Sequence, residues 1–133
     1  MNCPDCGNET VAFAVPDEYR DLAPDEHEAV ALCTTCLALH PTASADPDSD
    51  SDPDFAAVSD DFPTGAAAIP MALAVGLLDS LALHRSEVEG LLRRVESAGT
   101  DPLLVLDRLA ADPALDPQVD LGTRRKQVEQ FRE

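Results

Sequence analysis

The residues of this chain best suited to chemistry are its four cysteines, which form two pairs with the same C-x-x-C spacing. The pairs are Cys3-Pro4-Asp5-Cys6-Gly7 and Cys33-Thr34-Thr35-Cys36. Two such pairs, a few tens of residues apart, can place four thiolates at the corners of a tetrahedron, about 2.3 Å from one metal ion. The spacing therefore predicts one metal site, with ligands Cys3, Cys6, Cys33 and Cys36.

The residues around the first pair suit a tight metal-binding turn. Pro4 restricts the backbone between the ligands, and Gly7 can adopt the positive φ that turns backbone N–H groups toward sulfur. Leu37 follows the second pair in place of a glycine, so the second pair is less typical. Four protein thiolates would leave no open coordination position, and we therefore expect a structural site.

Other uses of the cysteines fit the sequence less well. A redox dithiol needs only one pair and a thioredoxin-like βαβ setting, and two disulfides need an oxidising compartment. A single iron in the same cage would make a rubredoxin-like electron carrier. Thr34-Thr35 and Leu37 depart from the rubredoxin pattern, and the chain has no Trp. We expect one structural Zn²⁺ ion.

The remaining polar residues do not suggest catalysis. The three histidines are His27 in an acidic loop, His40 just beyond the second pair and His84 at a helix junction. His40 could replace a cysteine as a metal ligand, but four cysteines already fill a tetrahedral site, so each histidine is expected to be solvated or to act as a cap. The sequence also lacks a nucleophile elbow, a phosphate-binding glycine loop and an H-E-x-x-H motif. We expect no enzyme activity and no small-molecule substrate.

Arg124-Arg125-Lys126 is the only basic cluster, and it is the candidate contact for nucleic acid. Phosphate affinity depends on Lys and Arg, whereas residues 1–42 contain Arg20 as their only Lys or Arg. A solvated helix face, with Glu129 and Glu133 as partners, is the alternative interpretation. Nucleic-acid binding therefore stays the less favoured reading.

The net charge of the chain is extreme for its length. Its 133 residues carry a formal net charge of −17, with 26 acidic against 9 basic residues. Such acidity often accompanies disorder, but 44% hydrophobic residues and clear helical periodicity argue against disorder for most of the chain. The composition resembles that of proteins from salt-in haloarchaea, which work where the Debye length is about 3 Å. The charge thus indicates a habitat more than a partner.

The apolar runs are too short to cross a bilayer. The most apolar one, residues 65–78, contains Pro70 and falls short of the roughly 18 to 20 residues that a spanning helix needs. The N-terminus begins on a cysteine pair, without a positive or apolar targeting region. We expect a cytoplasmic protein with no membrane partner.

The chain is predicted to be a small α+β protein with three regions. Residues 1–42 are expected to form a three-stranded zinc ribbon, 43–62 an acidic flexible linker and 63–133 an all-α helical bundle. Apolar alternation predicts strands over 10–15 and 29–32, and a third short strand around Leu37 and Leu39. Neither end can bury a large core alone, so the metal is expected to stabilise the N-terminal part.

Helix signals fill the last region. A first helix is predicted from Thr64 to about Leu83, and a second from a capping box at Ser86 to a stop at Gly99. Asp101-Pro102 and Asp116-Pro117 each place a capping residue before a proline and predict the starts of two more helices. The expected inward positions of the last three helices are Val88, Leu91, Leu92, Val95, Leu103, Leu106, Leu109, Ala110, Val119, Leu121, Val128 and Phe131. Phe55, Val58 and Phe62 are expected to hold the linker's end against the helices or to form a docking motif.

The cysteine pairs and the acidic composition resemble the small CPxCG-related zinc-finger proteins of haloarchaea. The stretches 78–82 and 120–125 are similar to an uncharacterised haloarchaeal family of this size. The resemblance implies zinc at the four cysteines and carries no activity with it. We expect an adaptor or regulator that binds another protein, with the ribbon and the helical part as two contact surfaces held at variable distance. The alternatives are a nucleic-acid-associated regulator of transcription or translation and a rubredoxin-like iron carrier.

Overall fold

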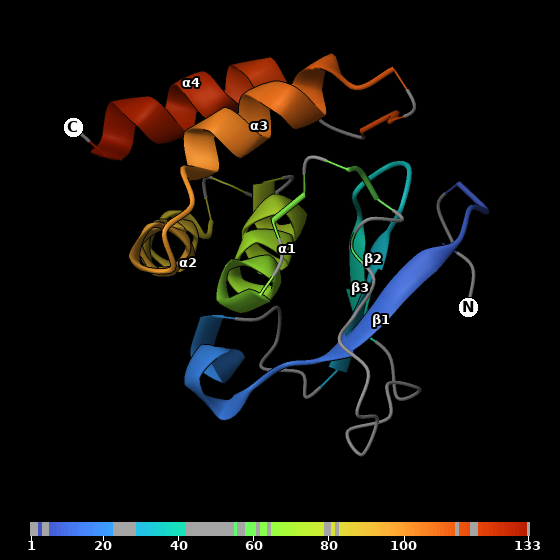
Figure 1. The fold of residues 1–133 in the computed structure, drawn as a ribbon, viewed down its shortest axis with the longest axis horizontal. Helices are drawn as coiled ribbons and strands as arrows, with labels where there is room; N and C mark the ends of the chain where they lie inside the picture. Colours follow the sequence, from blue (N-terminus) through green and yellow to red (C-terminus); the bar gives the residue numbers. More distant parts are fainter. Residues whose placement is uncertain are drawn as a thin grey trace.

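Within the part of the chain that the structure describes, three antiparallel strands and four α-helices form a small α+β fold (Figure 1). The structure is a computed structural model that describes residues 3, 6–22, 29–41, 55, 58–60, 62–63, 65–78, 81, 83–113, 115–117 and 120–132. The strands are β1 (Thr10–Ala14), β2 (Ala29–Cys33) and β3 (Leu39–Pro41). The helices are α1 (Ala68–Leu77), α2 (Arg85–Ser97), α3 (Pro102–Ala111) and α4 (Leu121–Arg132), with 3-10 turns η1 (Asp17–Leu22) and η4 (Gly65–Ala67).

The three strands, whose presence the alternation predicts, form one antiparallel sheet in the order β1-β2-β3. The central strand β2 is buried on both faces from Val30 to Cys33, whereas Phe13 of β1 and the following Val15 are buried on one face only. The predicted third strand begins later than expected, since Leu37 lies outside it. The reason is that Leu37 has φ 62°, which is incompatible with a strand.

Helix α1 packs directly on the sheet and is buried at almost every position. A Cβ added to Gly76 would lie 2.4 Å from Cβ of Leu39 in β3, so the glycine permits the close approach of helix and strand. The helix ends at Leu77, and the predicted end near Leu83 is therefore wrong. Pro70 lies in its first turn, where its missing N–H removes no helical hydrogen bond.

Helix α2 begins one residue before the predicted capping box. Its N-cap is His84, no side chain accepts a hydrogen bond there, and Ser86 is already inside the helix, so the capping-box prediction is wrong. The predicted end is confirmed, because Gly99 has φ 92° and donates its N–H to the carbonyl of Glu96. The predicted inward residues Val88, Leu91, Leu92 and Val95 are all buried.

The two remaining helices lie side by side across one end of the molecule (Figure 1). Helix α3 starts as predicted, since the Asp101 carboxylate accepts hydrogen bonds from the N–H groups of Leu103 and Leu104. Helix α4 starts five residues later than Asp116, because Asp120 supplies the cap by accepting from Thr123 N–H at 3.1 Å. Of the expected inward positions, Leu106, Leu109, Leu121 and Val128 are buried, whereas Ala110 is exposed. Val119 and the side chain of Phe131 lie outside the described residues.

The sheet and the helices share one hydrophobic core. Phe13, Val30 and Leu32 of the strands belong to the same buried cluster as α1 and α2. Phe55 and Phe62 join this cluster, with ring centroids 5.1 Å apart, so both rings pack in the shared core. The expectation that the ribbon and the helical part are two surfaces held at variable distance does not agree with this shared core. Residues 43–54 of the predicted linker lie outside the described residues.

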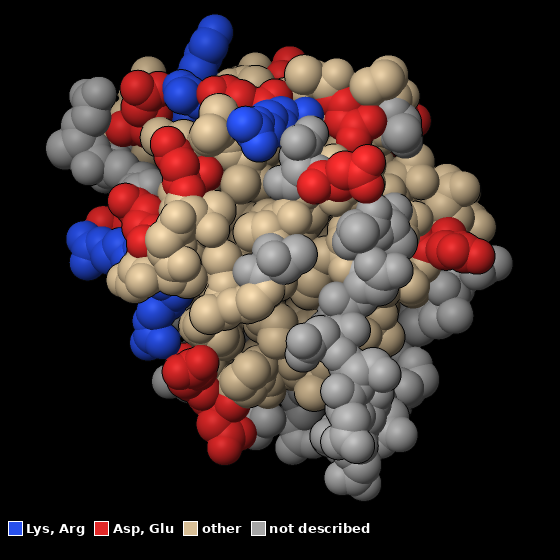
Figure 2. All heavy atoms as spheres, viewed as in Figure 1, with Lys and Arg blue, Asp and Glu red and all other residues tan. Residues whose placement is uncertain are grey.

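A polar contact also ties the N-terminal part to the helices. The guanidinium carbon of Arg94 in α2 lies 5.4 Å from the centre of the Tyr19 ring in η1. The same guanidinium lies 3.7 Å from the Glu18 carboxylate, an exposed pair that adds little stability. On the face in Figure 2, basic side chains lie beside acidic ones, which keeps the positive charges locally neutralised.

Candidate metal centre

The register of the sheet brings the two cysteine pairs together. Thr10, the first residue of β1, is paired with Cys33, the last residue of β2. The first pair precedes β1 closely and the second pair begins where β2 ends, so both pairs lie at the same end of the hairpin. Residues 27 to 33 positions apart thereby meet, which confirms that the sequence pairs converge.

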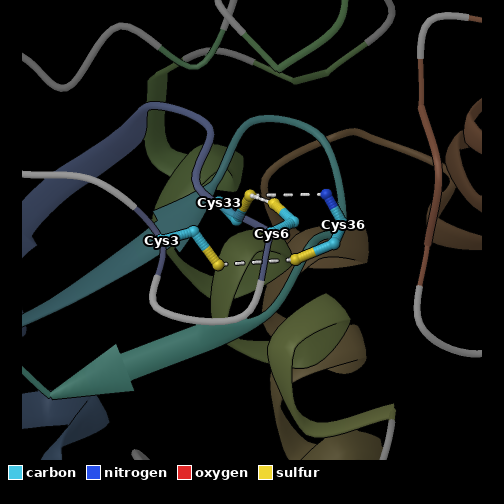
Figure 3. Close-up of side chains that lie close together, drawn as sticks. All are labelled: Cys3, Cys6, Cys33 and Cys36. Carbon is cyan, nitrogen blue, oxygen red and sulfur yellow. Dashed lines mark hydrogen bonds between the residues drawn. The ribbon is translucent and has the colours of Figure 1, made fainter.

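All four cysteine Sγ atoms lie within 4.8 Å of one another (Figure 3). Sγ of Cys3 is 3.6 Å from Sγ of Cys36, and Sγ of Cys6 is 3.4 Å from Sγ of Cys33. A tetrahedral tetrathiolate site with metal–sulfur bonds of about 2.3 Å requires sulfur–sulfur separations of about 3.8 Å. A disulfide requires about 2.05 Å, and all four thiols are free. The cluster fits a metal ion and not two disulfides.

The first turn has the backbone geometry expected for it. Cys3 N–H donates to the Asn8 carbonyl at 2.7 Å, and Gly7 N–H donates back to the Cys3 carbonyl at 2.9 Å. Gly7 has φ 80°, as predicted, a conformation that costs a residue with a Cβ about 1 to 2 kcal/mol. The turn thus brings the side chains of Cys3 and Cys6 into the same cluster.

The second turn reaches a similar conformation without a glycine. Thr35 N–H and Cys36 N–H both donate to Sγ of Cys33 at 3.4 Å, and Leu37 has φ 62°. The strain at Leu37 costs about 1 to 2 kcal/mol. Its side chain is only 5% exposed, and burying a leucine contributes about 1.5 to 3 kcal/mol. Burial therefore offsets the strain.

The residues between the ligands of the second pair anchor the site to its surroundings. Thr34 donates its N–H and its hydroxyl to the carbonyl of Glu9, at 3.0 Å and 2.8 Å, and so connects the second turn to the end of the first. The Thr35 carbonyl accepts the N–H of Asp116, from the connection between α3 and α4, at 2.9 Å. Hydrogen bonds thus connect the second cysteine turn to Glu9 and to the connection between α3 and α4.

Burial and hydrogen bonds act on the thiols in opposite directions. Hydrogen bonds from the backbone and the side chain of Asn8 lower the pKa of the exposed Cys6 thiol to about 6. Burial raises the pKa of the Cys33 and Cys36 thiols. A nearby divalent cation favours thiolates, so it would offset the cost that burial imposes on those two ligands.

One residue beside the cluster was misjudged from the sequence. Nε2 of His40 lies 3.6 Å from Sγ of Cys3, although this histidine was expected to be solvated or to cap a helix. Asn8, which donates to Cys6, was not singled out at all. Register could have found His40, because it pairs with Ala31, two residues from Cys33. Of the other histidines, His84 is the N-cap residue of α2 and His27 lies outside the described residues.

The basic cluster is largely engaged with acidic and polar neighbours on α3 and α4. Nε of Arg125 is 2.9 Å from the Asp107 carboxylate of α3, and its Nη1 is 2.5 Å from the Glu129 carboxylate. Nη1 of Arg124 donates to the side-chain oxygen of Gln127 at 2.8 Å. Lys126 is exposed. Arg125 therefore links two helices, and a nucleic-acid contact through this cluster stays a prediction.

Comparison with known proteins gives a family but no activity. The chain matches a protein family described as "Family of unknown function (DUF6276)" over residues 2–132. No curated protein and no solved structure matches it. Among the residues that the structure describes, no helix has the length and apolar character needed to span a membrane.

Proposed function

The chain belongs to the family DUF6276, whose description assigns no activity, and from its cysteine cluster we propose that it is a non-catalytic protein built around one structural zinc ion. Cys3, Cys6, Cys33 and Cys36 are the proposed ligands. When bound, the ion supplies a double positive charge and four bonds that cross-link the two turns. It leaves no coordination position for a substrate.

One observation carries this proposal, namely the approach of all four sulfur atoms to within 4.8 Å of one another. Four thiolates this close together would repel each other, and a divalent cation removes that repulsion. Zinc accepts this geometry without distortion, and thiolate ligands select it over magnesium or calcium.

The experiment is mass spectrometry of the purified protein under native conditions, together with elemental analysis. We expect one zinc per chain, and no zinc after Cys33→Ser. His84→Gln is the control, since it changes a histidine outside the cluster. An apo chain, or cysteines joined as disulfides, would refute the proposal. A red protein with one iron per chain would support the rubredoxin-like electron carrier instead.

The proposed role of the zinc-stabilised chain is to bind another protein as an adaptor or regulator. Since the sheet and the helices share one core, partners would meet the surface of one packed unit rather than two separate ones. Nucleic acid is the alternative partner, although Arg125 is already paired with two carboxylates. Capture of partners at high salt, with and without nuclease treatment, separates the two. Partners lost with nuclease would favour the nucleic-acid role.

A further inference from the structure

His40 approaches the cysteine cluster because of its position in the sheet. It pairs with Ala31 across β2 and β3, so both side chains lie on the same face. Cys33, two residues beyond Ala31, shares that face by strand alternation, whereas Leu39 and Leu32 belong to the opposite, core-facing side. The register therefore directs the imidazole toward the cysteines, and its Nε2 lies 3.6 Å from Sγ of Cys3.

Two of the other three sulfur atoms accept hydrogen bonds from nitrogen donors. Cys33 Sγ accepts the N–H groups of Thr35 and Cys36, and Cys6 Sγ accepts the side-chain amide of Asn8, all at 3.4 Å. Among the residues that the structure describes, His40 takes this position for Cys3, whose side chain is buried.

From this geometry we infer that His40 is a positioning residue of the metal centre, and that its imidazole donates Nε2–H to the Cys3 thiolate without itself binding the metal. This inference rests on the zinc site proposed above. Such a donor orients the ligand and withdraws electron density from sulfur. It also spreads the charge of the centre, because four thiolates and one Zn²⁺ carry a net charge of −2 in a chain that is already strongly acidic.

His40 lies outside the coordination sphere itself. Its Nε2 is not in the group of possible ligand atoms that meet within 4.8 Å, which, among the described residues, consists of the four cysteine sulfurs. Four thiolates complete a tetrahedral zinc site. The distance of 3.6 Å suits an N–H···S hydrogen bond, which is longer than an N–H···O bond because sulfur is the larger acceptor.

The test compares the full chain with His40→Phe, His40→Gln and the control His84→Phe, each loaded with Co²⁺ and titrated with a chromophoric chelator. We expect His40→Phe to bind the metal about 10 to 100 times more weakly. Its sulfur-to-cobalt charge-transfer band should move to longer wavelength, because the thiolate loses a hydrogen bond. His40→Gln keeps an N–H donor and should restore part of both changes. His84→Phe should match the wild-type chain.

The outcomes separate this inference from the proposed function. A wild-type chain that binds no metal would overturn both. A wild-type chain that binds metal through four thiolates, with the same band and affinity in His40→Phe, would overturn only the role of His40. A spectrum of three thiolates and one imidazole would also overturn it. Long-range ¹⁵N–¹H NMR of the zinc-loaded wild type needs no variant: we expect Nε2 to be protonated, and a bare Nε2 would contradict the inference.

Discussion

The N–H of Asp116 donates to the carbonyl of Thr35 at 2.9 Å, which joins the connection between α3 and α4 to the turn that holds Cys33 and Cys36. Leu115, the neighbour of Asp116, is buried in the shared core. Two parts of the chain that are about 80 residues apart are thus linked through one peptide carbonyl inside the turn that holds two of the candidate ligands. We therefore expect the conformation of that turn to influence the position of α3 and α4.

Removal of the metal is expected to loosen this link. A chelator frees the two cysteine turns, the Thr35 carbonyl becomes mobile, and the Asp116 amide loses a hydrogen bond worth about 0.5 to 1.5 kcal/mol. Hydrogen exchange followed by NMR should then show the Asp116 amide exchanging roughly 2 to 10 times faster. The Ala98 amide, which bonds to Arg94 at the end of α2, is the internal control. Unchanged exchange at Asp116 would mean that the turn keeps its shape without metal.

Gly76→Ala is expected to destabilise the fold. The new Cβ would lie 2.4 Å from Cβ of Leu39, so α1 and β3 would have to separate. Overpacking of this kind costs about 1 to 3 kcal/mol and outweighs the better helix propensity of alanine, which is worth up to about 1 kcal/mol. Urea unfolding measures the difference.

Gly122→Ala is the matched control, because it is also a glycine-to-alanine change within a helix. Among the described residues its Cβ would approach Oδ1 of Asp120, at 3.3 Å; this exposed side chain caps α4 and would have to shift by a few tenths of an ångström. We expect an effect within about 0.5 kcal/mol, or a small gain. If both variants lost the same stability, the close approach of α1 to β3 would not be the cause of the loss in Gly76→Ala.

Asp101→Ala and Ser86→Ala test where helix caps act. The Asp101 carboxylate accepts two backbone N–H groups at the start of α3, so its removal should cost about 1 kcal/mol. Ser86 lies inside α2, which begins at Arg85, and Ser86→Ala should be neutral or slightly stabilising. Thermal unfolding by circular dichroism compares the two variants. A larger loss for Ser86→Ala would restore the capping box that the sequence predicts.

Arg125→Ala and Lys126→Ala distinguish a structural role of the basic cluster from a binding role. Arg125 is 27% exposed and bridges α3 to Glu129 of its own helix. Since Asp107 and Glu129 are about half exposed, solvent weakens both ion pairs, and the expected loss is about 0.5 to 1 kcal/mol. Lys126→Ala should leave stability unchanged. If both variants keep full stability, and both bind a resin that carries nucleic acid equally less well than the unchanged protein, the cluster is a binding surface.

Much of the secondary structure could be predicted, because it depends on local patterns. The alternation around Phe13 marks a strand, Asp101-Pro102 marks a helix start and Gly99 marks a helix end, and the structure has all three. The failures have local causes as well. Ser86 has the side chain of a cap, but α2 already begins one residue before it. Asp120 caps α4 in place of Asp116. Two candidate caps near one helix cannot be ranked without knowing which turn packs on the core.

The amino-acid order alone sets the composition of the candidate centre: four cysteines at two matched spacings, with Gly7 where the first turn needs a positive φ. The surroundings of the centre depend on how the chain packs. Strand register directs His40 to Cys3, and burial lets Leu37 take a strained φ in the second turn. The tertiary structure also joined sheet and helices in one core, because Gly76 lets α1 reach Leu39. The types and spacings of the ligands are local features of the sequence. Contacts between residues of different strands and helices form only when the chain packs.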